Sequence, residues 1–170
     1  MSLTFLLGGA RSGKSSLAVE LARAWNGPVS VIATGEPGDE EMAERIRLHR
    51  AERPAEWETI EEPIELEAAL LRVPPEGAAV VDCLSLWVSN LMERGDGDAE
   101  IETLGSAAAV LAAKRTALTV AVSNEVGLGV VPATELGRRY RDVLGRINAQ
   151  WAAAADDAAL VIAGRMLPLS

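Results

Sequence analysis

The stretch GGARSGKS, residues 8–15, decides the fold of this 170-residue chain. It has the spacing Gly-x-x-x-x-Gly-Lys-Ser of a phosphate-binding loop (P-loop), with the apolar run LTFLL before it and the helical pattern KSSLAVELARAW after it. The glycines let backbone N–H groups turn toward phosphate oxygens, and the start of the following helix adds the positive end of its dipole. Lys14 then reaches the terminal phosphates, and the Ser15 hydroxyl is placed to ligate magnesium. A glycine-rich turn with a chance lysine is the alternative, but the flanking strand and helix favour the P-loop.

Short apolar runs alternate with longer amphipathic ones along the chain, which predicts one α/β domain over residues 1–170, with a mostly parallel sheet and helices on both faces. Strands are predicted over residues 3–7, 29–33, 57–60, 78–82, 117–123 and 159–163. Helices are predicted over residues 14–24, 40–53, 64–71, 84–92, 101–115 and 134–154. The acidic segment 93–100 is interpreted as a solvated loop, and the ending AGRMLPLS, residues 163–170, receives no role.

Apolar residues in the last predicted helix recur at steps of three and four, which indicates one buried stripe. They are Leu136, Tyr140, Val143, Leu144, Ile147 and Trp151.

The composition narrows the classes of function. The formal net charge is −9, with 16 Lys and Arg against 25 Asp and Glu, so a general nucleic-acid-binding protein is not expected. The longest stretch without a charged residue has twelve residues (24–35), whereas a membrane span needs about 20. The N-terminus has no basic region before its apolar run, which argues against a signal peptide. Cys83 is the sole cysteine, which excludes an internal disulfide and a four-cysteine zinc site, and a cytoplasmic protein is expected.

Polar residues follow two of the predicted strands, where the ligands of open α/β sheets bind. Asp82 ends the run AAVVD, the place where P-loop proteins put an acid that supports the metal; capping of the next helix is the alternative. Asn124 and Glu125 follow the run ALTVAVS directly and precede two glycines, Gly127 and Gly129. Such a loop can approach a ligand closely, can be mobile, or can be an ordinary connector. Glu125 is a candidate for a metal ligand or for the base of an acceptor hydroxyl, and the sequence leaves both open.

The only histidine, His49, lies in IRLHRAER, residues 46–53. On a helix, Arg45 and Arg53 share its face, and Arg50 is adjacent to it. Arginines disfavour the protonated imidazole and so keep a neutral ring available as a nucleophile, and they also attract a triphosphate. Spacing alone still favours the other interpretation, a solvated helix face.

Five segments occur in order over essentially the whole chain: GGARSGKS, EEMAERIRLHRAERPAEWETIEEP, VVDCLSLWVSNLM, VSNEVGLGVVP and GRINAQWAAAAD. Together they resemble the bifunctional adenosylcobinamide kinase / adenosylcobinamide-phosphate guanylyltransferase family of cobalamin biosynthesis. The resemblance implies a RecA-like P-loop NTPase fold and a two-step enzyme. Such an enzyme phosphorylates adenosylcobinamide with ATP or GTP. It then transfers GMP from GTP to adenosylcobinamide phosphate through a guanylyl-histidine, giving adenosyl-GDP-cobinamide.

The resemblance also implies roles for individual residues. His49 is the expected GMP-histidine nucleophile, and Lys14 is the second catalytic residue. From the residues themselves, Mg²⁺ is the expected cofactor, with Ser15 and Asp82 as candidate ligands, and Asn124 and Glu125 form a possible substrate loop. The expected assembly is a homo-oligomer, a trimer in the family. The implied nucleotide-binding residues are Gly8, Gly9, Ala10, Arg11, Ser12, Gly13, Lys14, Ser15, Ala33, Thr34, Gly35, Arg50, Ala51, Glu52, Arg53, Glu61 and Asp82.

Two other functions fit parts of this pattern. A plain P-loop small-molecule kinase would use His49 only to bind nucleotide and would release no pyrophosphate from GTP. A non-catalytic nucleotide-binding switch would bind GTP tightly without turnover, but it gives no reason for an arginine-flanked histidine near the phosphates.

Overall fold

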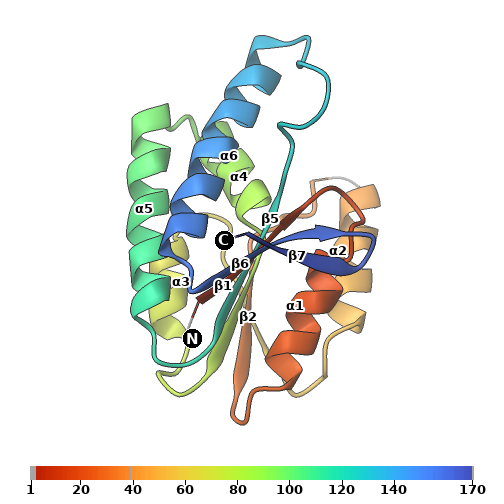
Figure 1. The fold of residues 1–170 in the computed structure, drawn as a ribbon, viewed down its shortest axis with the longest axis vertical. Coiled ribbons are helices and arrows are strands. Elements are labelled where there is room, and N and C mark those ends of the chain that lie inside the picture. Colours follow the sequence, from red (N-terminus) through yellow and green to blue (C-terminus); the bar gives the residue numbers. More distant parts are fainter. Residues whose placement is uncertain (1–2, 39, 170) are drawn as a thin grey trace.

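One sheet runs through the computed structural model, which describes residues 3–38 and 40–169 and all their side chains except those of Met42 and Arg45. Within these residues the sheet has seven strands (Figure 1). Their spatial order is β3 (Glu58–Glu61), β2 (Val29–Ala33), β4 (Ala78–Asp82), β5 (Thr119–Asn124), β1 (Leu3–Gly8), β6 (Asp157–Ile162) and β7 (Arg165–Leu169). The first six in the chain run parallel and β7 runs antiparallel to β6, so the predicted mostly parallel sheet is confirmed.

Helices cover both faces of the sheet (Figure 1). On one face lie α1 (Lys14–Arg23) and α2 (Glu40–Ala51), and on the other α3 (Leu66–Arg72), α4 (Leu84–Arg94), α5 (Asp98–Lys114) and α6 (Glu135–Ala154). The larger core cluster joins the sheet to the second group and contains Phe5, Trp87 and Trp151. The smaller cluster packs α1 on the sheet through Ala18 and Ala22. By contrast, none of the described side chains of α2 is buried.

The predicted elements are all present, but one predicted loop is wrong. Of the acidic segment 93–100, the first two residues belong to α4 and the last three to α5. Asp98 and Glu100 stand in the first turn of α5, where negative side chains favour the helix dipole. Asp96, between the helices, is buried and paired with Arg94, so the acidic residues here build helix ends and an ion pair.

The stripe predicted for α6 is confirmed except at its start. Val143, Leu144, Ile147 and Trp151 are buried, whereas Leu136 is 64% exposed. The first turns of α6 extend beyond the end of the sheet (Figure 1), and Leu136 belongs to the first turn of this helix. Although α6 has 20 residues, neither it nor another helix in the described ranges is long and apolar enough to cross a membrane.

The tail, to which the sequence assigned no role, forms β7 and a tight hairpin with β6. Ala163 and Gly164 make the turn, and both have positive φ, 50° and 74°, as a two-residue hairpin turn requires. The sequence gives little signal for it because alanine rarely adopts that conformation. The Gly164 N–H donates to the Ser12 carbonyl at 2.7 Å, so this turn lies against the P-loop.

Candidate active site

The P-loop follows β1 directly, and close packing explains its two defining glycines. A Cβ on Gly8 would collide with the carbonyl oxygen of Val161 on β6. Gly13 has φ +97°, a conformation that side chains rarely adopt, and a Cβ there would lie 3.1 Å from Gly164 Cα. The neighbouring strand and hairpin turn therefore leave no room for a side chain at Gly8 and little at Gly13.

Lys14 is the first residue of α1 and is only 6% exposed. Its Nζ donates to the Gly9 carbonyl at 2.6 Å and to Ser12 Oγ at 3.3 Å, which holds the ammonium group inside the loop. Ser15 follows it and is partly buried, while Arg11 is exposed with a left-handed backbone at φ 56°. The loop thus presents two cations and a hydroxyl beside its backbone N–H groups, which suits phosphate binding.

His49 does not lie on an ordinary solvated helix face, because its side chain meets the end of β4. His49 Nδ1 lies 3.6 Å from Asp82 Oδ2, and Arg53 Nη2 lies 2.9 Å from the same oxygen. The side chains of His49, Asp82 and Arg53 are 32%, 14% and 10% exposed, respectively. A separation of 3.6 Å is longer than a hydrogen bond. Arg53 therefore makes the short hydrogen bond to Asp82, whereas His49 lies next to that carboxylate at the longer distance.

The ionisation of Asp82 reflects these neighbours. Burial acts to raise the pKa of Asp82, but the His49 ring and the Arg53 guanidinium outweigh burial and hold that pKa below its usual range. Asp82 is therefore a carboxylate near neutral pH, and it lies at the end of β4, as the sequence predicted.

The strand register relates this cluster to the P-loop. Gly8 pairs with Asn124 on β5, and Val122 of the same strand pairs with Asp82. The P-loop strand and the Asp82 strand are therefore separated by β5 alone, about 10 Å from axis to axis. Both strands end at the same edge of the sheet, so the structure brings Asp82 and the His49 helix to the edge that carries the P-loop.

The predicted residues after β2 and β3 also reach this edge, but in different ways. Glu61, at the end of β3, pairs with Arg50 at 3.3 Å in an exposed ion pair. Thr34 is fully buried, and its hydroxyl donates to the Cys83 carbonyl at 2.7 Å and accepts from the Cys83 N–H at 2.8 Å. Thr34 therefore joins the loop after β2 to the chain after Asp82, and a nucleotide contact by it stays a prediction.

Some predicted residues lie at the margin of the cluster. The side chains of Ala51 and Glu52 are exposed, and the Glu52 carbonyl accepts from Arg23 of α1. The Glu125 N–H donates to the Gly8 carbonyl at 3.0 Å, but its carboxylate accepts from the Gly127 N–H. The Arg45 side chain, predicted to share the His49 face, lies outside the described side chains.

Asn90 on α4 was not predicted from the sequence. Its Nδ2 donates to the Thr34 carbonyl at 2.7 Å and to the Pro63 carbonyl at 3.0 Å. These bonds join the loops that follow β2 and β3. No local pattern signals them, since the partners lie 56 and 27 residues away. Among the described residues, no group of three or more His, Cys, Asp or Glu side chains could hold a metal ion by itself.

Comparison with known proteins gives one consistent result. Residues 4–169 match the family model described as cobinamide kinase / cobinamide phosphate guanyltransferase. The chain is 44% identical to the bifunctional adenosylcobalamin biosynthesis protein CobP of Pseudomonas aeruginosa, over 96% of this chain and 95% of that protein. It is 37% identical to the bifunctional adenosylcobalamin biosynthesis protein CobU of Escherichia coli, over 95% of this chain and 96% of that protein.

A solved structure shares the fold. It is an ATPase from the type III secretion system of pathogenic bacteria, with a TM-score of 0.51 and 12% identity. The match covers 94% of this chain and half of that ATPase. Together with the strand order, this likeness confirms the predicted RecA-like α/β fold.

Proposed function

The chain belongs to the cobinamide kinase / cobinamide phosphate guanyltransferase family, and on that premise we propose that it catalyses both reactions in adenosylcobalamin biosynthesis. First, the hydroxyl of adenosylcobinamide attacks the γ-phosphorus of ATP or GTP, and the nucleoside diphosphate leaves. Second, GMP passes from GTP through His49 to the new phosphate, giving adenosyl-GDP-cobinamide and pyrophosphate. One observation carries the proposal: His49 lies beside Asp82 at the sheet edge that carries the P-loop.

The P-loop performs the kinase half in this proposal. Its backbone N–H groups hold the phosphates, and Lys14 balances the charge that develops on the transferred phosphoryl group. The Ser15 hydroxyl and the Asp82 carboxylate are hard oxygen donors, the kind that Mg²⁺ takes, and phosphate oxygens and water complete such a site. Bound Mg²⁺ would supply positive charge to the phosphate oxygens.

His49 performs the guanylyl half. Asp82 faces Nδ1, and in this proposal the other ring nitrogen, Nε2, attacks the α-phosphorus of GTP. A P–N bond forms and the P–O bond to pyrophosphate breaks; a phosphate oxygen of adenosylcobinamide phosphate then attacks the same phosphorus, and the P–N bond breaks. Arg50 and Arg53, with Lys14, offset the negative charge of the entering triphosphate.

The remaining assignments belong to the same proposal. They are the nucleotide-binding set given above, the substrate loop of Asn124 and Glu125, one domain over the whole chain, a cytoplasmic location and a homotrimer. Light scattering of the purified protein measures its mass and so tests the trimer.

The covalent step has a direct test. With GTP labelled at the α-phosphate, the wild type is expected to form a protein adduct that is labile in acid and stable in alkali, as a phosphoramidate is. His49→Ala should form none, yet should still phosphorylate adenosylcobinamide with ATP. Lys14→Ala should lose both activities, because both require phosphates on the P-loop.

A matched control lies on the same helix. Arg47 pairs with Glu44 at 2.6 Å on the exposed side of α2, so Arg47→Ala should label like the wild type. An undiminished adduct in His49→Ala would remove the covalent role of His49. Phosphorylation without pyrophosphate release from GTP would leave the plain kinase as the function.

A further inference from the structure

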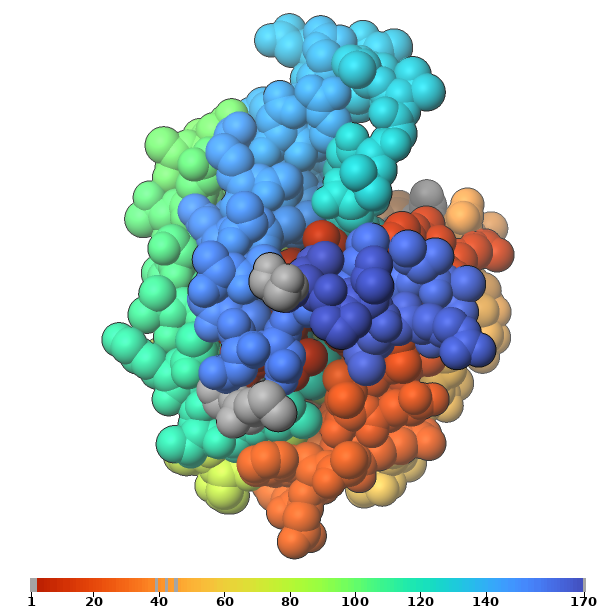
Figure 2. All heavy atoms as spheres, in the orientation of Figure 1, coloured from red at the N-terminus to blue at the C-terminus, as the bar shows by residue number. Residues whose placement is uncertain are grey.

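The segment between β5 and α6 carries an exposed apolar surface that the active site described above does not use. We call residues 125–136 the arm. The exposed large apolar side chains of the arm are Val126, Leu128, Val130, Val131 and Leu136, with Leu128 at 82% and Val130 at 95%. In Figures 1 and 2 the arm and the start of α6 stand out from the body of the molecule beyond the end of the sheet.

Internal hydrogen bonds hold the arm in shape. Arg138 Nη1 donates to the carbonyls of Pro132 and Ala133 at 3.0 and 2.9 Å. The Thr134 hydroxyl accepts from the Gly137 N–H at 3.1 Å and caps α6. The arm is thus an ordered element that displays apolar side chains to water. Exposed apolar side chains gathered on one ordered segment are typical of a binding surface.

The base of the arm is joined to the P-loop. Asn124 pairs with Gly8 in the sheet, and the Glu125 N–H donates to the Gly8 carbonyl at 3.0 Å. A molecule lying on the arm therefore lies next to the place where the nucleotide phosphates are expected.

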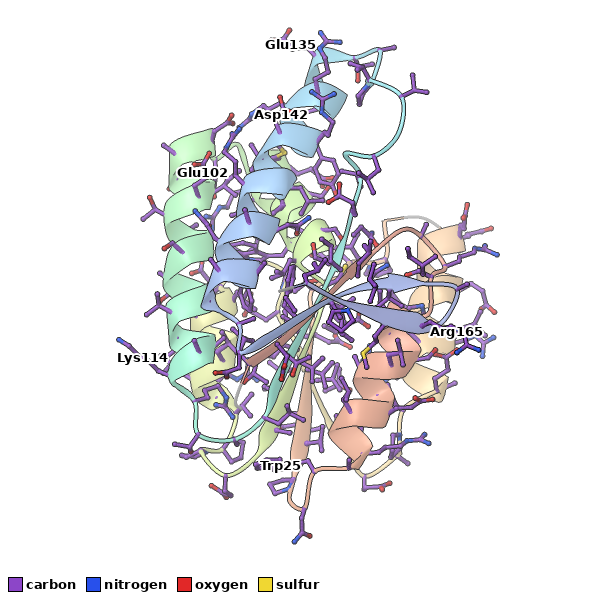
Figure 3. The ribbon with its side chains drawn as sticks, viewed as in Figure 1. Trp25, Glu102, Lys114, Glu135, Asp142 and Arg165 are labelled. Carbon is purple, nitrogen blue, oxygen red and sulfur yellow. The ribbon has the colours of Figure 1, made fainter. Side chains whose placement is uncertain are left out.

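Two cavities among the described residues do not suit a large acceptor. The larger, about 490 Å³, is lined by Trp25, Pro28 and Trp57 at the opposite end of β2. Figure 3 shows Trp25 at the bottom of the molecule and Glu135, at the tip of the arm, at the top. The smaller, about 130 Å³ between Arg53 and Trp57, is too small for a macrocycle. Neither of these two cavities accommodates a corrinoid, so an open surface next to the P-loop is the candidate to consider.

We propose that the arm is the corrinoid-binding surface of this enzyme, an inference that rests on the proposed function. The methyl-bearing edge of the corrin ring lies against Leu128, Val130 and Val131, and the side chain that carries the reacting hydroxyl points toward the P-loop. No charged residue occurs from 126 to 134 in this acidic chain, which suits a ring bordered by methyl and uncharged amide groups. Burial of these side chains provides the affinity.

The test compares two exposed apolar sites. Leu128→Ser with Val130→Ser removes the centre of the patch, and Leu71→Ser on α3, where Leu71 is 72% exposed, is the control. Equilibrium dialysis, followed by the visible absorbance of the corrinoid, measures binding, and kinetics give KM for adenosylcobinamide. The double variant should weaken binding and raise KM at least about tenfold, equivalent to about 1.4 kcal/mol, and the control should match the wild type. Labelling of His49 by GTP without corrinoid should not change.

Two results would overturn this assignment. One is corrinoid binding and KM equal to the wild-type values in the double variant. The other is a change of solution mass, measured by light scattering, which would assign the arm to contacts between copies of the chain. Loss of GTP labelling in the wild type would instead count against the proposed function, so the two failures are distinguishable.

Discussion

Asp82, at the end of β4, forms an ion pair with Arg53 and lies beside His49. These contacts help to hold the C-terminal end of α2 against the edge of the sheet that carries the P-loop. Few other contacts can do this, because no described side chain of α2 is buried. The Arg50–Glu61 pair is exposed and contributes little, as surface ion pairs do. The partly buried Asp82–Arg53 pair is therefore a contact that helps to hold His49 in position.

Asp82→Asn should lower the free energy of unfolding by about 1–3 kcal/mol at pH 7, because Arg53 loses a charged acceptor. The pKa of Asp82 is lowered on folding, so its charge stabilises the fold above the unfolded-state pKa of about 3.9. That contribution is lost as the pH falls through the lower, folded-state pKa. Urea unfolding between pH 7 and pH 3 should therefore show the difference between variant and wild type shrinking below about pH 4.

The control for this prediction is Glu44→Gln, which removes the charge of a largely exposed pair with Arg47. It should change stability by less than about 0.5 kcal/mol at each pH. A constant difference between Asp82→Asn and the wild type across the pH range would contradict the lowered pKa.

Helix α4 acts as a support for the active-site loops as well as a part of the core. Leu84, Trp87 and Leu91 are buried against the sheet side of the fold, and Asn90, on the same helix, joins the loops after β2 and β3. The loop after β2 contains Thr34, and the loop after β3 begins just beyond Glu61; both residues are predicted nucleotide contacts. The P-loop, by contrast, packs against β6 and the hairpin turn. The loops after β2 and β3 therefore have a support of their own, separate from that of the P-loop.

Asn90→Leu should slow labelling of His49 by GTP about tenfold, as a change of about 1.4 kcal/mol in barrier would. The substitution leaves the carbonyls of Thr34 and Pro63 without their Asn90 donor, which weakens the connection between the loops after β2 and β3. Phosphorylation of adenosylcobinamide should fall much less, because the P-loop has no bond to Asn90. Both rates are measured on one preparation, with Ser89→Ala as the neighbouring control. Equal loss of the two rates would show a general loss of folded protein instead.

Across the whole molecule, Arg115 joins the end of α5 to the connection between α3 and β4. Its guanidinium donates to four backbone carbonyls, at 2.6–3.4 Å. The acceptors are Leu70, Val73, Pro74 and Gly77. These contacts lie at the end of the sheet away from the P-loop, so they serve stability and not the active site.

Arg115→Met should lower the free energy of unfolding by about 2–4 kcal/mol, because four part-buried carbonyls lose a charged donor. Urea denaturation measures the loss. Lys114→Met removes the same charge from the adjacent exposed residue, labelled in Figure 3, and should change stability by less than about 0.5 kcal/mol. Labelling of His49 per folded molecule should be normal in both. A small loss in Arg115→Met would show that water replaces the guanidinium at these carbonyls.

The sequence by itself determined the P-loop, the strands 29–33 and 78–82, the α/β class and, by resemblance, the role expected of His49. These rest on patterns within a few residues, such as glycine spacing and apolar periodicity, which act before distant parts of the chain meet. Only the tertiary structure decided that Asp82 meets Arg53, that Asn90 joins two loops, and that the arm stays exposed. Arg53 and Asp82 lie 29 residues apart, and Leu136 is exposed although it continues the apolar stripe of α6. Contacts and exposure of this kind depend on how whole elements pack, which no local pattern encodes.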